Sequence, residues 1–385
     1  MLRRLHLAAV TAVFALSAAY APAFAQVTTP VATTSSDATP ASTARTAAPA
    51  ASWTTSLDRQ VRAIDTRLGS GEIGVYVQRL DSGASYGFRA SEVWYLASGV
   101  KVPIAIAVMR EIEQGWLTLD TQVALRPDDF VDGAGGTNAH RAGDRLTIAW
   151  LLEQMLVYSD NTASDVLIRT VGLGQVNAVA LELITPAGAH ITTLADVRRL
   201  AYGMLHPAAS DLQSRDLLSL QRAGTGQARV RRLAQILGVA QSDFLLPDLD
   251  SAFAAYYASH ANSASLRDYG HMLAALNAGR ALEPESTRYL LEVMARVQTG
   301  KQRIRAGLPA DARFAHKTGT QYRRTCDSGI VTLPPRSGAA PAPVVVAACV
   351  RGAGLAASER ALRELGAAVT ASVVSEPVAP IATPR

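Results

Sequence analysis

Hydrophobic and polar positions along the chain predict strands near both ends and helices between them. Apolar residues three or four positions apart predict a first helix over residues 56–68, begun by a capping serine. Alternation around the turn Asp81-Ser82-Gly83 predicts a hairpin. The predicted strands cover residues 72–80, 84–89, 314–321, 326–333 and 344–351. A final helix is predicted over residues 359–374. Periodicity alone therefore indicates an α+β fold.

The middle of the chain has the spacing of helices. Residues 98–113 are apolar on nearly every side, so this helix should be buried. Further helices are predicted over residues 146–158, 161–171, 173–183, 194–205, 230–239, 265–276 and 283–298. The segment 186–262 is mostly helical and is expected to form an enlarged all-helical lobe.

The first 25 residues have the pattern of a secretory signal. Arg3 and Arg4 precede an apolar run over residues 7–20, and Ala23-Phe24-Ala25 is a small-x-small cleavage site. A membrane anchor is the alternative, but the run is too short to span a bilayer and no other stretch approaches that length. We therefore expect export, cleavage after Ala25, and a periplasmic or secreted protein without a stable membrane anchor.

Composition divides the rest of the chain. Residues 26–52 are rich in Ala, Thr, Ser and Pro and are expected to form a flexible linker. Residues 53–374 form the expected folded domain, and residues 375–385 a Pro-rich tail. The chain has 385 residues, of which 49% are hydrophobic, enough for a substantial core.

The net charge of +5 does not by itself indicate an acidic partner. Arginines occur singly or in pairs, such as Arg198-Arg199 and Arg323-Arg324, without a basic helix or interleaved aromatic residues. A solvated surface explains them better than a nucleic-acid site. We expect no nucleic-acid partner.

The chain has two cysteines, Cys326 and Cys349. Both lie on predicted antiparallel strands, and a hairpin that pairs Val331 with Val344 would place them opposite each other. A disulfide and two buried free thiols both remain open. No suitably spaced histidines accompany them, so a zinc site is not expected.

Three short motifs follow one another in the chain. Ser98 and Lys101 stand three residues apart at the start of a predicted helix, so that hydroxyl and amine project from one face. Ser159-Asp160-Asn161 and Lys317-Thr318-Gly319 come later. The chain has only three lysines, Lys101, Lys301 and Lys317, beside 34 arginines. Arginine cannot release a proton at working pH, so two retained lysines indicate sites that need an amine.

These motifs in this order are the signature of class A β-lactamases and penicillin-binding proteins, and the chain resembles that family from about residue 53 to residue 374. The resemblance implies a five-stranded antiparallel sheet with terminal helices beside an enlarged all-helical lobe, and a catalytic cleft between them. It implies an acyl-serine hydrolase, which we expect to be a monomer without cofactor or metal. The implied substrate is a small molecule, either a β-lactam or a peptidoglycan peptide.

The resemblance also assigns roles. Ser98 would be the acylated nucleophile, Lys101 its base or proton shuttle, and Ser159 the carrier of a proton to the leaving nitrogen. Lys317 would lower the pKa of Lys101 and attract the substrate carboxylate. The implied substrate-binding residues are Asn161, Thr318, Gly319, Thr320 and one of Arg323 and Arg324, where related enzymes place a carboxylate-binding arginine. The N–H groups of Ser98 and Thr320 would form the oxyanion hole. A solvent-facing strand is the alternative for the two arginines.

One element of the family pattern is missing. Efficient class A enzymes use Glu-x-x-Leu-Asn to activate the deacylating water, but no glutamate occurs between residues 183 and 262. The nearest echo is Leu246-Pro247-Asp248-Leu249-Asp250, which offers Asp248 or Asp250 as a base. A turn between helices is the other interpretation.

Three functions are therefore open. The first is an exported β-lactamase that confers antibiotic resistance. The second is a D-Ala-D-Ala cell-wall peptidase or a slowly deacylating penicillin-binding protein, and the third is a non-catalytic module that binds wall fragments. The turnover of a β-lactam separates these three hypotheses.

Overall fold

The computed structural model describes residues 52–184, 189–334 and 342–374. The predicted signal at 1–25, nearly all of the linker at 26–52 and the tail at 375–385 lie outside the described residues. The first helix, α1 (Ser52–Arg67), begins at Ser52, the last residue of the predicted linker. It begins four residues before the predicted start, since Trp53 is buried in the core.

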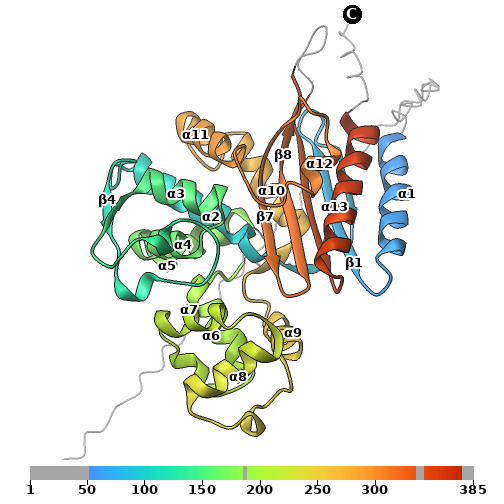
Figure 1. Cartoon of the computed structure of the whole chain (residues 1–385). Coiled ribbons are helices and arrows are strands. Elements are labelled where there is room, and N and C mark those ends of the chain that lie inside the picture. The colour runs from blue at the N-terminus through green and yellow to red at the C-terminus, as the bar shows by residue number, and fades with distance from the viewer. Residues whose placement is uncertain (1–51, 185–188, 335–341, 375–385) are drawn as a thin grey trace, which may run out of the picture. The chain divides into compact units, whose positions relative to one another are not determined.

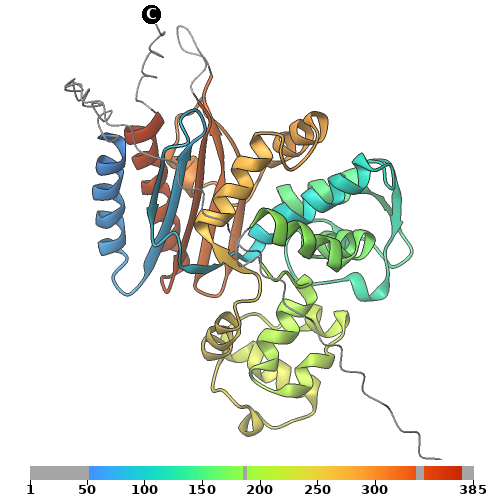
Figure 2. The same cartoon turned by 180° about the vertical axis from the view of Figure 1, so that it is seen from behind.

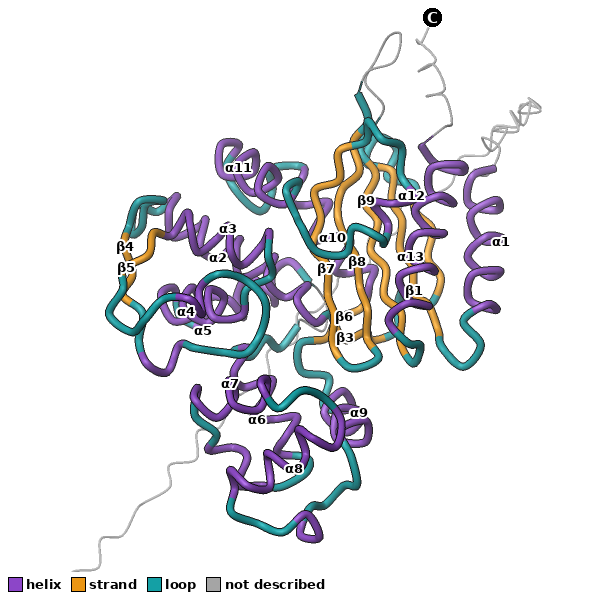
Figure 3. Tube along the Cα trace, viewed as in Figure 1, coloured by secondary structure: helices purple, strands orange, loops and turns teal. Residues whose placement is uncertain are grey.

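A five-stranded antiparallel sheet is the centre of the fold, with strand order β2-β1-β9-β8-β7 (Figures 1 and 3). The strands are β1 (Glu72–Arg79), β2 (Ser85–Phe88), β7 (Arg313–Gln321), β8 (Arg324–Thr332) and β9 (Val344–Arg351). Strand β7 lies at one edge. All five strands were predicted from the sequence, with end positions that differ by at most two residues.

Each face of the sheet belongs to a different hydrophobic core. On the outer face, valines of β1 and β9 pack with α1 and α13 (Leu355–Val369). On the inner face, α10 (Leu266–Asn277) packs against β9, and the helices between residues 101 and 294 extend that core (Figure 2). Alternation along each strand thus separates an outer set of side chains from an inner set.

The other helices lie in the middle of the chain. They are α2 (Lys101–Glu113), α3 (Ile148–Val157), α4 (Asn161–Val171), α5 (Leu173–Leu183), α11 (Pro284–Met294) and α12 (Ile304–Gly307). The segment predicted as an enlarged lobe contains α6 (Leu194–Gly203), α7 (Ser214–Arg222), α8 (Gly226–Leu237) and α9 (Leu249–Ala258). We call residues 194–258 the inserted lobe. Two short strand pairs complete the fold: β3 (Val93–Tyr95) with β6 (Ser263–Ser265), and β4 (Gln122–Ala124) with β5 (Arg145–Thr147).

The two ends of the inserted lobe meet. The backbone N–H of Asn262 donates to the carbonyl of His190 over 2.8 Å, and the Asn262 side chain bonds with Thr192. These contacts close the segment as a loop, so its helices extend from the fold without interrupting the sheet. The chain then enters β6, which pairs with β3 immediately before Ser98.

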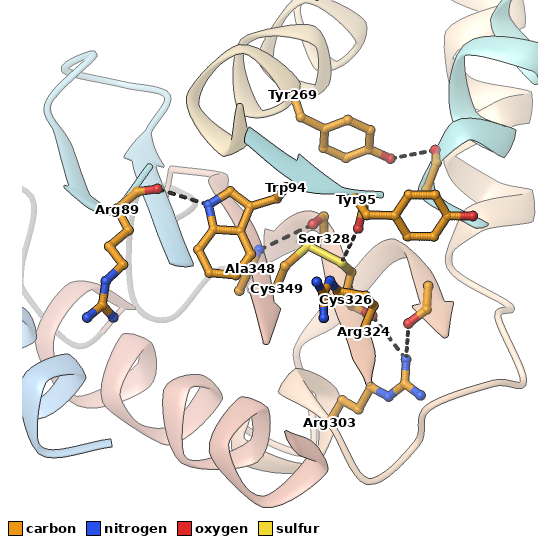
Figure 4. Close-up of a disulfide and its surroundings, with 12 residues drawn as sticks. Arg89, Trp94, Tyr95, Tyr269, Arg303, Arg324, Cys326, Ser328, Ala348 and Cys349 are labelled. Atoms are coloured by element: carbon orange, nitrogen blue, oxygen red, sulfur yellow. Dashed lines mark hydrogen bonds between the residues drawn. A yellow bond between two sulfur atoms is a disulfide. The ribbon is translucent and has the colours of Figure 1, made fainter. Parts of the chain in front are cut away.

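Strands β8 and β9 pair Val331 with Val344 and Cys326 with Cys349. The two sulfur atoms form a disulfide on the inner face of the sheet (Figure 4). Among the described residues, no single helix is both long and apolar enough to cross a bilayer. Only α4 and α5 together reach that length, and their axes diverge by 94°.

Candidate active site

Ser98 lies in a tight turn that several contacts hold in place. The residues Ala97–Val100 form a 3₁₀ helix before α2, so the helix predicted from residue 98 becomes α-helical only at Lys101. Ala97 has a φ of 49°, a left-handed conformation that costs energy for a residue with a Cβ. The N–H of Leu96 donates to Asn262 O over 2.9 Å, and the hydroxyl of Tyr269 donates to Gly99 O over 2.9 Å (Figure 4). Ser98 itself is partly exposed.

Gly319 of β7 lies directly against this turn. A Cβ at residue 319 would stand 2.5 Å from the carbonyl oxygen of Leu96 and 3.0 Å from the Cβ of Ala97. Real carbon atoms do not approach that closely, so only glycine allows the edge strand to reach the residues before Ser98. The close approach brings the Lys317-Thr318-Gly319 motif next to the Ser98 turn.

Lys101 is fully buried, and its Nζ donates to three acceptors. These are Ser159 O at 2.6 Å, Asn161 Oδ1 at 2.8 Å and Ser159 Oγ at 3.3 Å. Burial lowers the pKa of Lys101 to about 7, against the opposing charges of Asp160 and Asp165. A substantial fraction of the amine is therefore neutral near pH 7 and can accept a proton.

Lys317 reaches the same serine from the opposite side. Its Nζ donates to Ser159 Oγ over 3.0 Å and to Thr318 O over 3.1 Å. Burial, followed by the charges of Lys101 and Arg303, holds the pKa of Lys317 well below its ordinary value. Ser159 therefore stands between two amines that share no carboxylate partner among the described residues.

Backbone geometry presents the Ser159 hydroxyl to both amines. Ser159 has a φ of 64°, and the next residue, Asp160, caps α4 by accepting from Ala163 N over 2.9 Å. The other carboxylate oxygen of Asp160 accepts from Thr137 N over 2.9 Å. The motif is thus both a helix cap and part of the site.

The motifs therefore meet in space. Lys101, Ser159, Asn161 and Lys317 are joined by hydrogen bonds, and Ser98 lies one helical turn before Lys101. No described residue hydrogen-bonds with Ser98 Oγ. The proton carriers are thus joined to one another, and the Ser98 hydroxyl near them stays free to attack.

The threonines of β7 differ in their surroundings. Thr318 is buried and its hydroxyl pairs with that of Thr299, whereas Thr320 is exposed and its Oγ1 accepts from Arg303. The carbonyl of Thr318 is available to Lys317 Nζ, which indicates that it faces away from β8. Backbone groups two residues apart face the same way in a strand, so we expect the N–H of Thr320 to face away from β8 too.

Arg303 is a site residue that the sequence analysis missed. It is buried beside β7, where Nη1 donates to Gly319 O and Cys326 O at 3.0 Å each, and Nη2 to Thr320 Oγ1 at 2.7 Å. It precedes the four-residue helix α12 in a loop, and no periodic pattern or motif marks it. Only tertiary contacts reveal a second cation beside Lys317.

The structure does not bring Arg323 or Arg324 to the lysines. Arg323 occupies the turn between β7 and β8, exposed and 4.0 Å from Asp250. The guanidinium of Arg324 stacks on Tyr257 of α9, 4.4 Å from the ring centroid. Neither guanidinium hydrogen-bonds with Lys317 or Ser159, and the cation that reaches β7 beside the motif is Arg303.

Asp248 and Asp250 are engaged away from the lysines. Asp248 caps α9, accepting from Ser251 N over 2.8 Å, and this hydrogen bond lowers the pKa of its carboxyl. A lowered pKa makes the carboxylate a weaker base. Asp250 is exposed and faces Arg323. Neither contacts Lys101, Ser159 or Lys317, and Asp248 begins a helix, as the turn interpretation expected.

One arginine interpretation is wrong. Arg198 was expected on a solvated surface, but its side chain is 14% exposed and its Nε donates to Asp132 Oδ1 over 2.7 Å. Its partner lies more than sixty residues earlier, so the sequence gives no local sign of the pair.

In the described part of the chain, no group of three or more His, Cys, Asp or Glu side chains is placed to hold a metal ion.

Comparison with known proteins agrees with this geometry. Residues 56–373 match the model of the family described as "Beta-lactamase enzyme family". A β-lactamase of Streptomyces albus G is 26% identical over 72% of this chain and 73% of its own length. One of Mycobacterium tuberculosis is 29% identical over 71% and 70%. The solved structure of PBP-A covers 84% of this chain and 97% of its own, with a TM-score of 0.62 and 22% identity, which shows the β-lactamase/transpeptidase-like fold.

Proposed function

Because the chain belongs to the β-lactamase enzyme family, we propose that it opens β-lactam rings through an acyl-serine intermediate on Ser98. The observation that supports this most is the contact of Ser159 Oγ with two buried amines, at 3.3 Å from Lys101 and 3.0 Å from Lys317. A hydroxyl held between two amines can move a proton between them. The site thus has the parts of an acid–base relay beside a free serine.

In the proposed acylation, Ser98 Oγ attacks the β-lactam carbonyl carbon while the neutral amine of Lys101 accepts its proton. The carbonyl oxygen becomes an oxyanion near the backbone N–H groups of Ser98 and Thr320. As the C–N bond breaks, Ser159 Oγ delivers a proton to the leaving nitrogen and is reprotonated from the lysines. Reprotonation of Ser159 needs no movement of side chains, because both amines already lie within hydrogen-bond distance of its hydroxyl.

Two cations support recognition of the substrate carboxylate in this proposal. Lys317 and Arg303 adjoin Thr318, Gly319 and Thr320, the edge along which a substrate would lie. Asn161 can donate or accept through its amide while it holds Lys101. Arg323 and Arg324 lie at the hairpin tip and would contact only a long substrate side chain.

A second function, that of a penicillin-binding protein or D-Ala-D-Ala peptidase with slow deacylation, is favoured by one observation. Among the described residues, no Asp or Glu hydrogen-bonds with or forms an ion pair to Lys101, Ser159 or Lys317. A positioned general base contributes roughly 10²- to 10⁴-fold to a rate. Without one, the acyl-enzyme should form readily and hydrolyse slowly.

Incubation of the purified protein with nitrocefin and with a fluorescent penicillin tests these proposals. Many turnovers support the β-lactamase. One equivalent of bound drug, retained on Ser98 by mass spectrometry, supports the slow penicillin-binding protein. Failure to acylate excludes both and favours a non-catalytic module. Ser98→Ala must lose all labelling, and labelling that persists would exclude Ser98 as the nucleophile.

We also propose that the protein is exported and that β-lactam hydrolysis outside the cytoplasm protects the cell. The signal pattern over residues 1–25 and the disulfide between Cys326 and Cys349 support export, since such bonds persist in oxidising compartments. Cell fractionation with antibodies to the folded domain tests the location. A deletion strain that keeps its full β-lactam tolerance would exclude the protective role.

A further inference from the structure

We propose that Arg198 of the inserted lobe is a positioning residue of the acylation site, which orients Asn161 through Asp132 and keeps a positive charge beside Lys101. The inference rests on the proposed roles of Ser98 and Lys101. It assigns to the inserted lobe a part in positioning the base, beyond any influence on which substrates fit.

Three hydrogen bonds connect the lobe to the base. Arg198 Nε donates to Asp132 Oδ1 over 2.7 Å, and the backbone carbonyl of Asp132 accepts from Asn161 Nδ2 over 2.6 Å. Asn161 Oδ1 then accepts from Lys101 Nζ over 2.8 Å. All four residues are buried or nearly so, which keeps water from replacing a lost link.

The lobe supports the same loop at a second point. Gln221 of α7 donates to the carbonyl of Gly133, over 3.3 Å. Gly133 lies against Asn161, because a Cβ at residue 133 would be 2.7 Å from Asn161 Nδ2. The loop that orients Asn161 is therefore held between α4 and the lobe.

The charge of Arg198 acts on Lys101 as well. Asp160 and Asp165 raise the pKa of Lys101, whereas burial, the largest cause, and Arg198 lower it. Lys317 faces Lys101 through Ser159, and the guanidinium of Arg198 itself faces Asp132, Tyr95 and Tyr202. Without the Arg198 cation, the two carboxylates would act with less opposition and favour the protonated amine.

Arg169 offers a matched control. It lies on α4, and its guanidinium forms two hydrogen bonds of 2.8 Å with the buried carboxylate of Asp129, near the start of the same loop. The pair resembles Arg198–Asp132 in type and burial. It has no recorded contact with Asn161 or Lys101.

The test compares the pH dependence of acylation by a penicillin in the wild type and in Arg198→Gln, Arg198→Lys and Arg169→Gln. The acid limb is the part of the pH–rate profile below the Lys101 pKa, where the acylation rate rises with pH. For Arg198→Gln, we expect this limb to move to higher pH, with a rate loss of about tenfold at pH 6 for each unit that the Lys101 pKa rises. Arg198→Lys keeps the charge and should keep the limb. Arg169→Gln should lower thermal stability and leave the limb in place.

An unmoved limb in Arg198→Gln, or an equal movement in Arg169→Gln, would overturn the proposal. If Arg198→Gln does not fold, Asp132→Asn tests the geometric link, since it keeps the carbonyl bound to Asn161 but loses the ion pair. A severalfold slower acylation is then expected, and an unchanged rate contradicts the link. If wild-type Ser98 is never acylated, the proposed function fails first, and separately.

Discussion

His316 and Lys317 are neighbours on β7, yet they face opposite sides of the sheet and have opposite kinds of surroundings. On the outer face, His316 Nδ1 lies 2.7 Å from the buried carboxylate of Asp327, and the ring stacks on Phe314. On the inner face, Lys317 meets a hydroxyl and another lysine, through Ser159. His316 is thus paired with a carboxylate, whereas Lys317 is hydrogen-bonded only to neutral groups.

The difference separates structural from chemical use of a buried base. A buried ionisable group is least costly when a hydrogen-bonded partner of opposite charge compensates it. The outer pair meets that condition, whereas the inner lysines lack a carboxylate partner and carry lowered pKa values. The sheet therefore confines the costly arrangement to the side where a substrate would bind.

The largest effect on acylation is expected when an inner lysine is replaced with a permanent cation. Lys101→Arg keeps a positive charge but removes the group that can become neutral. We expect the second-order rate of acylation by a penicillin to fall by about 10² to 10⁴. Circular dichroism serves as the folding control, and a folded variant that retains more than a tenth of the rate would exclude Lys101 as the base.

The pH dependence of acylation should reflect the lowered pKa of Lys101. Because the pKa of Lys101 is about 7, the neutral amine predominates only above that pH. Acylation should rise about tenfold per pH unit below pH 7 and level off above it. Stopped-flow measurement from pH 5 to pH 9 checks this, with the unfolding temperature recorded at each pH. A flat profile in a folded protein would contradict a titrating lysine base.

On the outer face, the expected cost is in stability. His316→Asn shortens the side chain and weakens its contact with Asp327, whose other oxygen still accepts from Ile304 N over 3.2 Å. We expect the free energy of unfolding to fall by about 1–3 kcal/mol. Urea titration measures this loss, while acylation at pH 8 should change less than twofold. A large loss of acylation with intact stability would assign His316 to the chemistry.

The smallest effect is expected at the hairpin tip. The contact between Arg323 and Asp250 is exposed and 4.0 Å long, so Arg323→Gln should change the free energy of unfolding by less than about 0.5 kcal/mol. Acylation by benzylpenicillin should change less than twofold, because Arg303 is the arginine beside β7. A tenfold loss would restore Arg323 as a carboxylate-binding residue.

Much of this arrangement was predictable from local sequence. A strand was predicted over residues 314–321, and alternation along a strand puts neighbours such as His316 and Lys317 on opposite faces. The expected pairing of Val331 with Val344 is the observed one. The motifs around Ser98, Ser159 and Lys317 indicated which side chains to look for. Such signals are local, because side-chain period and short spacing determine them.

The unpredicted parts depend on contacts between distant segments. Arg198 meets Asp132 across 66 positions, and Arg303 meets Gly319 across 16. In a chain with 34 arginines, neither residue stands out by type. The start of α2 at Lys101 depends on the strained turn at Ala97, which periodicity does not detect. Local sequence also does not show that Arg323 and Arg324 lie beside α9, where they meet Asp250 and Tyr257.

The bond between Cys326 and Cys349 fixes the register of β8 against β9. In an antiparallel pair, a shift by one residue turns every inward side chain outward. Cys326 faces Gly319 in β7 and Cys349 in β9, so a covalent link at this one rung fixes the alignment of the strand that supports Lys317. Oxidation therefore secures the correct alternation of faces in the rungs beside the reactive serine, and a chain made under reducing conditions would lack that safeguard.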